Sequence, residues 1–113
     1  MVDKLNLFGV YFYRYEYMVR FIWDENKNQT NIKRHGVDFN DAVRAWYDPD
    51  RLDFFDSEHS LDEVRWIFLG AVAGVVLFVV ETEPDEETVR IISARRASKR
   101  EQEVYYGNHN KNP

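Results

Sequence analysis

Two adjacent arginines, Arg95 and Arg96, are the residues in this sequence best suited to chemistry. They follow the β-branched pair Ile91 and Ile92, which is typical of a buried strand. Guanidinium groups match the geometry of phosphate, and the N-terminus of a helix also favours an anion. The pattern predicts a strand that runs into a basic helix, with phosphate ligands at the junction. The structural alternative is that both arginines pair with carboxylates or cover apolar surface with their stems.

Arg65 and Glu81 form a second candidate pair. Two neighbouring apolar segments joined by a tight turn at residues 72–74 predict an antiparallel hairpin, and either of two registers brings Arg65 and Glu81 within reach of each other. The structural alternative is a cross-strand ion pair worth roughly 0.2–1 kcal/mol. In the functional alternative, Glu81 accepts a ribose proton while Arg65 stabilises charge on a phosphate.

His35 is a further candidate for a general base, because an ordinary imidazole titrates near pH 6.5. It lies at the end of an expected helix, directly before Gly36, so it could equally complement the negative end of the helix dipole. The three histidines are scattered along the sequence and there is no cysteine. We therefore expect no metal site and no bound cofactor.

The length and composition of the chain indicate a single domain. A chain of 113 residues with 44% hydrophobic residues can bury a core. The longest apolar run, residues 66–80, contains two glycines and is shorter than the ~20 residues that span a bilayer, which predicts a soluble protein. The net charge of −5 argues against non-specific coating of nucleic acid. The cations nevertheless concentrate at residues 90–100, so a basic face is compatible with an acidic total.

The expected elements, in order, are a strand at residues 19–23, helices at 24–35 and 39–46, strands at 64–71, 75–82 and 88–94, and a helix at 95–106. Asp24 and Asp38 are good N-caps, and Gly36 is a good C-terminal stop. Residues 51–59 are expected to form a loop, with a short strand at 52–55 as the alternative. The fold class is α+β, in the order β-α-α-β-β-β-α, with apolar strands covered on both faces by helices.

The remaining segments are interpreted as additions to this domain. Residues 1–17 are rich in aromatics and lack the pattern of a signal peptide, and we interpret them as an N-terminal extension. The domain itself is expected at residues 18–107, followed by a polar tail at 108–113.

Two long motifs resemble the signatures of the BrnT family of bacterial toxins. The first comprises residues 21–27 and 31–39 together with Ala42, and the second comprises residues 91–101 together with Tyr105. The resemblance implies a RelE-like fold, an antiparallel sheet packed by helices. It also implies a cytoplasmic toxin of a type II toxin-antitoxin pair, which cleaves RNA and stops translation.

The resemblance further implies a BrnA-type antitoxin that neutralises the toxin and supplies the DNA contact through which the complex represses its own operon. On this interpretation the protein is a metal-independent endoribonuclease, with Arg95, Arg96 and Arg65 as phosphate ligands and Glu81 or His35 as base. The residues expected to hold the RNA backbone are Lys33, Arg34, Lys99 and Arg100. The alternatives are a non-catalytic interaction module, which uses the same basic helix for docking, and an inactive toxin that acts as co-repressor.

Overall fold

In the part of the chain that the structure describes, a sheet of five strands packs with three helices. A computed structural model describes residues 19–59 and 63–110, so the interpretation of residues 1–17 lies outside the described residues. The elements are β1 (Arg20–Ile22), α1 (Glu25–His35), α2 (Phe39–Trp46), β2 (Leu52–Phe55), β3 (Arg65–Val72), β4 (Val75–Asp85), β5 (Thr88–Arg96) and α3 (Lys99–Asn110). The strand order is β1-β5-β4-β3-β2, with β1 parallel to β5 and the other neighbours antiparallel.

One strand is missing from the predicted order. Residues 52–55, expected as a loop with a strand as the alternative, form β2 and extend the sheet beside β3. The mixed α+β class is confirmed, and the observed order is β-α-α-β-β-β-β-α. Within the described part of the chain, no helix has the length and apolar character that a membrane crossing requires.

The first two helices begin and end where their capping residues predict. The Asp24 carboxylate accepts hydrogen bonds from the backbone N–H groups of Asn26 and Lys27, at 2.8 and 3.2 Å. Gly36 ends α1 in the left-handed conformation (φ 71°) and donates its N–H to the carbonyl of Ile32. Asp38 caps α2 in the same way as Asp24 caps α1. These ends depend on local hydrogen bonds, which is why the sequence predicts them well.

The hairpin of β3 and β4 turns at Ala73 and Gly74, which both have positive φ, at 51° and 80°. This matches the two-residue turns that suit the twist of a hairpin. The resulting register pairs Arg65 with Thr82 and Trp66 with Glu81. Because directly opposed residues share a face and neighbours along a strand alternate, Arg65 and Glu81 point to opposite faces. The expectation that they lie within reach of each other is wrong.

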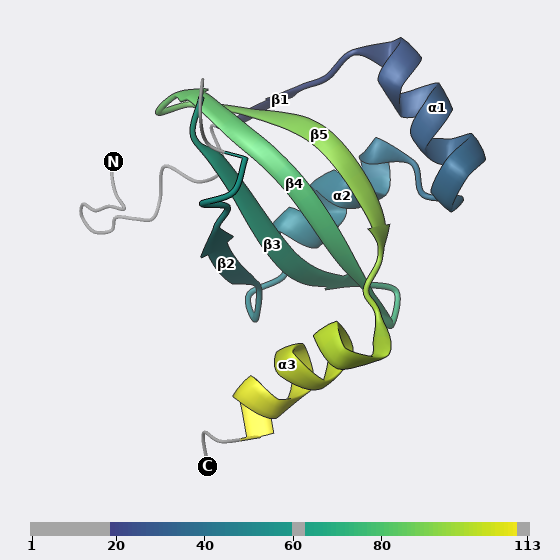
Figure 1. The fold of residues 1–113 in the computed structure, drawn as a ribbon, viewed down its shortest axis with the longest axis vertical. Helices are drawn as coiled ribbons and strands as arrows, with labels where there is room; N and C mark the ends of the chain where they lie inside the picture. Colours follow the sequence, from purple (N-terminus) through teal and green to yellow (C-terminus); the bar gives the residue numbers. More distant parts are fainter. Residues whose placement is uncertain (1–18, 60–62, 111–113) are drawn as a thin grey trace.

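The two faces of the sheet are covered to different extents. On one face, Phe68 and Val79 pack with the core residues of α2, which are Phe39, Ala42 and Ala45. The other face has a smaller cluster, in which Leu69 and Val76 meet Tyr105 of α3. Figure 1 shows α2 lying across the sheet and α3 at its lower end. The prediction that helices cover both faces is therefore confirmed. α2 covers one face, and α3 covers the other face only at one end of the sheet.

The last helix begins later than predicted. β5 continues through Arg95 and Arg96, which pair with Phe78 and Leu77 of β4, and α3 starts only at Lys99. Ser98 and Glu101 form a reciprocal cap: the Ser98 N–H donates to Glu101 at 2.8 Å, and the Glu101 N–H donates to the Ser98 hydroxyl at 3.1 Å. Pairing with β4 keeps Arg95 in the strand although its sequence context favours a helix. The cap formed by Ser98 and Glu101 marks the start of α3.

Candidate functional site

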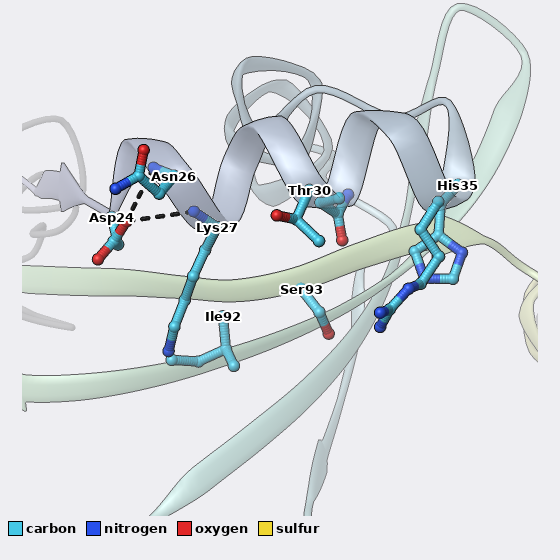
Figure 2. A pocket seen from close by; sticks show the side chains of 9 residues that line it. Asp24, Asn26, Lys27, Thr30, His35, Ile92 and Ser93 are labelled. Atoms are coloured by element: carbon cyan, nitrogen blue, oxygen red, sulfur yellow. Dashed lines mark hydrogen bonds between the residues drawn. The ribbon is translucent and has the colours of Figure 1, made fainter.

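A groove of about 320 Å³ separates α1 from β5. Its walls include Lys27, Arg34 and His35 from the helix, and Ile92 and Ser93 from the strand. Figure 2 shows the Lys27 side chain extending from α1 toward Ile92, with His35 at the opposite end of the helix. The groove thus combines an imidazole, two cations and two hydroxyls, and the carboxylate of Asp24 lies at its end where α1 begins.

Asparagine amides, rather than an apolar face, attach α1 to β5 and to the start of α2. β1 pairs with β5 only from Thr88 to Arg90. Further along β5, the buried Asn31 donates to the Ala94 carbonyl at 2.7 Å and accepts from the Ala94 N–H at 3.1 Å. One turn earlier on α1, the buried Asn28 accepts from the N–H of Phe39 at 2.9 Å. The Asn31 amide fixes the distance between α1 and β5, and so the width of the groove, while Asn28 attaches α1 to the start of α2.

A bulge in β5 shapes the floor of the groove. The register with β4 shifts there, so that Ile91 pairs with Glu81 but Ser93 pairs with Val80, which leaves Ile92 as an extra residue. Strict alternation would send Ile92 and Ser93 to opposite faces, and bulges can re-aim side chains. Here both residues line the groove.

Arg95 already has a carboxylate partner. Its guanidinium donates to both oxygens of Glu101, at 2.8 and 2.9 Å, and lies 4.0 Å from the centre of the Phe78 ring. The hydrogen bond with Glu101 raises the pKa of Arg95, and the same bond is the largest cause that lowers the pKa of Glu101. A bidentate pair of this kind imitates an arginine-phosphate contact, so a phosphate would have to displace Glu101.

Arg96 lies on the opposite face of the sheet from Arg95, because it is the next residue of the same strand. It is exposed, and its side chain makes no hydrogen bond or ion pair within the part of the chain that the structure describes. Ala94, which is bonded to Asn31 of α1, lies two residues earlier. Arg96 is therefore placed close to the end of α1 that carries Arg34 and His35, and its guanidinium is accessible to an anion.

Glu81 is buried on the face that α2 covers, with only 2% of its surface exposed. Burial, followed by a hydrogen bond with Glu83, raises the pKa of Glu81 to about 9. A carboxyl group of this kind is neutral at pH 7 and can donate a proton but not accept one. The predicted role of Glu81 as a base does not match this protonation state.

A family model described as "Ribonuclease toxin, BrnT, of type II toxin-antitoxin system" matches residues 23–101. The chain belongs to this BrnT family. It is also similar to the ribonuclease toxin BrnT of Brucella abortus, known from a 1.1 Å crystal structure, with 30% sequence identity and a TM-score of 0.58. The match covers 72% of this chain and 99% of the Brucella chain. No curated protein matches the sequence.

The expected site residues of this BrnT-family protein fall into separate groups. His35 and Arg34 line the groove, and Arg96 is near its end. Arg65 lies on β3, which is two strands away from β5, or roughly 10 Å at the usual strand spacing. Lys33, Lys99 and Arg100 are exposed and are not among the residues that line the groove.

Lys27, Thr30 and Ser93 are groove residues that the sequence interpretation of this BrnT-family protein missed. The sequence contains a signal for Lys27 and one for Ser93, but none for Thr30. Lys27 and Arg34 are seven residues apart, which places them on one side of a helix two turns apart. Ser93 is a polar residue within the apolar segment around Ile91 and Ile92.

Proposed function

We propose that this BrnT-family protein is an endoribonuclease toxin that cuts RNA at the groove between α1 and β5 and so inhibits translation. The observation that carries the proposal is the groove itself, which brings the imidazole of His35 together with Lys27 and Arg34. An imidazole can move protons near neutral pH, and cations attract and hold the RNA backbone.

The proposed reaction uses the nucleophile that RNA carries. The 2′-hydroxyl attacks the adjacent phosphorus, so that a P–O2′ bond forms and the P–O5′ bond breaks. His35 takes the proton of the 2′-hydroxyl, and a proton returns to the leaving 5′-oxygen. The products are a 2′,3′-cyclic phosphate and a 5′-hydroxyl. Positioning, proton transfer and charge stabilisation are sufficient for this reaction, and we propose that it needs no metal ion or other cofactor.

The cations have graded roles in this proposal. Arg34 and Arg96 stabilise the charge that develops on the phosphate. Arg95 joins them when phosphate replaces Glu101. Lys33, Lys99 and Arg100 steer and hold more distant parts of the RNA. Arg65 and Glu81 lie outside the groove, so we assign them at most an indirect contribution.

The partner follows from the family. A type II toxin is held inactive by a protein antitoxin, and we propose that here the antitoxin is of the BrnA type. On this proposal the complex acts in the cytoplasm and represses its own operon, with DNA contacted through the antitoxin alone. We also propose that the fold is related to that of RelE-like toxins.

Cleavage of labelled RNA by the purified protein in the presence of EDTA tests the enzymatic proposal. We expect cleavage that leaves cyclic phosphate ends, and a loss of at least about 100-fold in rate for His35→Ala, the usual scale of general base catalysis. Induction in a bacterium should arrest growth, and co-expression of the adjacent gene should relieve the arrest. A His35→Ala variant that cleaves as fast as the wild type would remove His35 from the mechanism.

A docking module is the second candidate function, and the pairing of Arg95 with Glu101 favours it. Arg95, one of the arginines that the sequence assigns to phosphate, is already neutralised in this structure. If the basic residues serve only to bind an antitoxin, as in a non-catalytic module or an inactive co-repressor, purified protein should leave RNA intact while still binding that antitoxin.

A further inference from the structure

We propose that the groove between α1 and β5 binds an unpaired RNA segment that lies along α1, with Lys27 and Arg34 on two of its phosphates. The inference rests on the proposed ribonuclease function and specifies the class of substrate. Within one helix, seven residues correspond to a rise of ~10.5 Å. That length matches about three nucleotides of a stacked strand, at ~3.4 Å each, or fewer of an extended one.

The size of the groove favours a single strand. Its volume of about 320 Å³ is at the lower end of the range of roughly 300–1,000 Å³ for pockets that hold small ligands. One or two nucleotides of a single strand are on this scale, whereas a double helix is too wide to enter. Proteins that recognise duplex RNA span successive grooves across its surface, and a crevice between a helix and a strand does not offer such a surface.

The polar groups between the two cations suit an unpaired nucleotide. Thr30 on α1 and Ser93 on β5 provide hydroxyls between them, and both line the groove. The Asp24 carboxylate also lines it, beyond Lys27, where it is occupied as the cap of α1. The two hydroxyls can hydrogen-bond base edges or the 2′-hydroxyl, which are accessible when bases are unpaired. Among the described residues that line the groove, His35 contributes the only aromatic ring. Recognition should therefore depend on hydrogen bonds more than on the stacking that many single-strand binders use.

The bulge gives the groove its strand-side wall. The extra residue at Ile92 lets both Ile92 and Ser93 face α1, so that an apolar contact and a hydroxyl lie opposite Lys27 and Thr30. Figure 2 shows Ser93 between Lys27 and His35. A nucleotide whose phosphate is bound by Lys27 would extend past Ser93 toward His35, where the proposed reaction takes place.

The test measures binding of 2′-O-methyl RNA, which lacks the nucleophilic hydroxyl and cannot be cleaved by the proposed reaction. One probe is a single strand and the other is the same strand paired with its complement. We expect the wild type to bind the single strand at least about 10-fold more tightly. Lys27→Ala and Arg34→Ala should each weaken that binding about 5- to 10-fold, and each should reduce the slope of log affinity against log salt by ~0.7.

Arg44→Ala is the matched control. Arg44 is an exposed cation in the last turn of α2, it pairs with Asp41 on the surface, and it is absent from the residues that line the groove. The control should change single-strand binding less than twofold. Equal affinity for the duplex, or equal losses in the control and in the groove variants, would overturn the inference.

Cleavage of unmodified RNA by the wild type is scored separately. If the wild type cleaves RNA but the groove variants bind normally, the inference fails and the proposed ribonuclease activity stands. If the wild type binds the single strand through Lys27 and Arg34 but cleaves nothing, the proposed function fails and the binding site stands. Lys27 and Arg34 are exposed, so an unchanged midpoint of thermal unfolding is expected for both variants.

Discussion

Arg95 and Arg96 are neighbours in the sequence but have different surroundings in the fold. Alternation along β5 directs Arg95 to the face that Glu101 and Phe78 occupy, and Arg96 to the face nearer α1. A pair of adjacent arginines suggests one bidentate phosphate site, yet adjacent residues of a strand cannot act together in this way. Their contributions therefore have to be tested one residue at a time.

Glu101→Gln should increase the affinity for RNA if Arg95 is a phosphate ligand. The change removes the charged partner of Arg95, while glutamine retains the oxygen that accepts from the Ser98 N–H and so preserves the helix cap. We expect a several-fold gain in binding of uncleavable RNA. Glu103→Gln, an exposed change of the same charge on the same helix, is the control. An equal gain in both variants would show that only the overall charge matters.

Glu81→Gln should stabilise the protein at alkaline pH. The pKa of Glu81 is raised from its usual 4.5 to about 9 by burial, so between these two values the folded state keeps a proton that the unfolded chain has released. Stability is therefore lost as the pH rises through this window. We expect the substitution to add ~1–3 kcal/mol to the free energy of unfolding at pH 8 and almost nothing at pH 4.

Urea denaturation of the wild type and Glu81→Gln at both pH values provides the measurement. Glu103→Gln controls for the loss of one carboxylate, and should show the same small effect at both pH values. If the gain from Glu81→Gln does not depend on pH, the carboxyl of Glu81 is not held protonated in the folded state.

At the scale of secondary-structure elements, local sequence signals such as capping residues predict the helices better than the strands. Asp24, Gly36 and Asp38 determine the ends of α1 and α2 through contacts within a few residues, so the sequence is sufficient there. β2, the extension of β5 to Arg96 and the bulge at Ile92 all depend on pairing with distant strands, which a sequence pattern does not contain. The groove was missed for the same reason, since it lies between a helix and a strand about 60 residues apart in the sequence.

Gly70→Ala should weaken the packing of α2 on the sheet. A Cβ atom at this position would clash with the carbonyl oxygen of Ala45, which belongs to the backbone of α2 and cannot move aside easily. We expect a loss of roughly 1–3 kcal/mol in the free energy of unfolding. Gly107→Ala is the control, because a Cβ there meets nothing within 4 Å and alanine favours a helix. A Gly70→Ala variant as stable as the wild type would contradict the close approach of α2.

Charge is distributed unevenly along the whole molecule, although the total is −5. Acidic residues fill the turn between β4 and β5, at the start of β5. The cations of the last turn of α1, together with Arg96, lie toward the end of β5. Along β5 the local charge therefore changes from acidic to basic, so RNA should approach the end of this strand that carries Arg96.

The salt dependence of binding should be shallow for an RNA that is short enough to fill only the groove. For such an RNA, the three phosphate contacts from Lys27, Arg34 and Arg96 predict a slope of log affinity against log salt of about −2, at ~0.7 per phosphate for a single strand. Titration of uncleavable RNA at several salt concentrations measures the slope. A slope steeper than about −5 would mean that a much larger basic surface is used, including Lys99 and Arg100.

The hydrogen bonds between Asn31 and Ala94 have a consequence for how copies of this protein behave toward one another. Past Arg90, the outer side of β5 would otherwise present unpaired backbone groups, which readily recruit a strand from a second molecule. The amide of Asn31 supplies one donor and one acceptor at that point, as a neighbouring strand would. We therefore expect Asn31 to disfavour the addition of a strand at this point, while the adjoining length of β5 remains available to the groove.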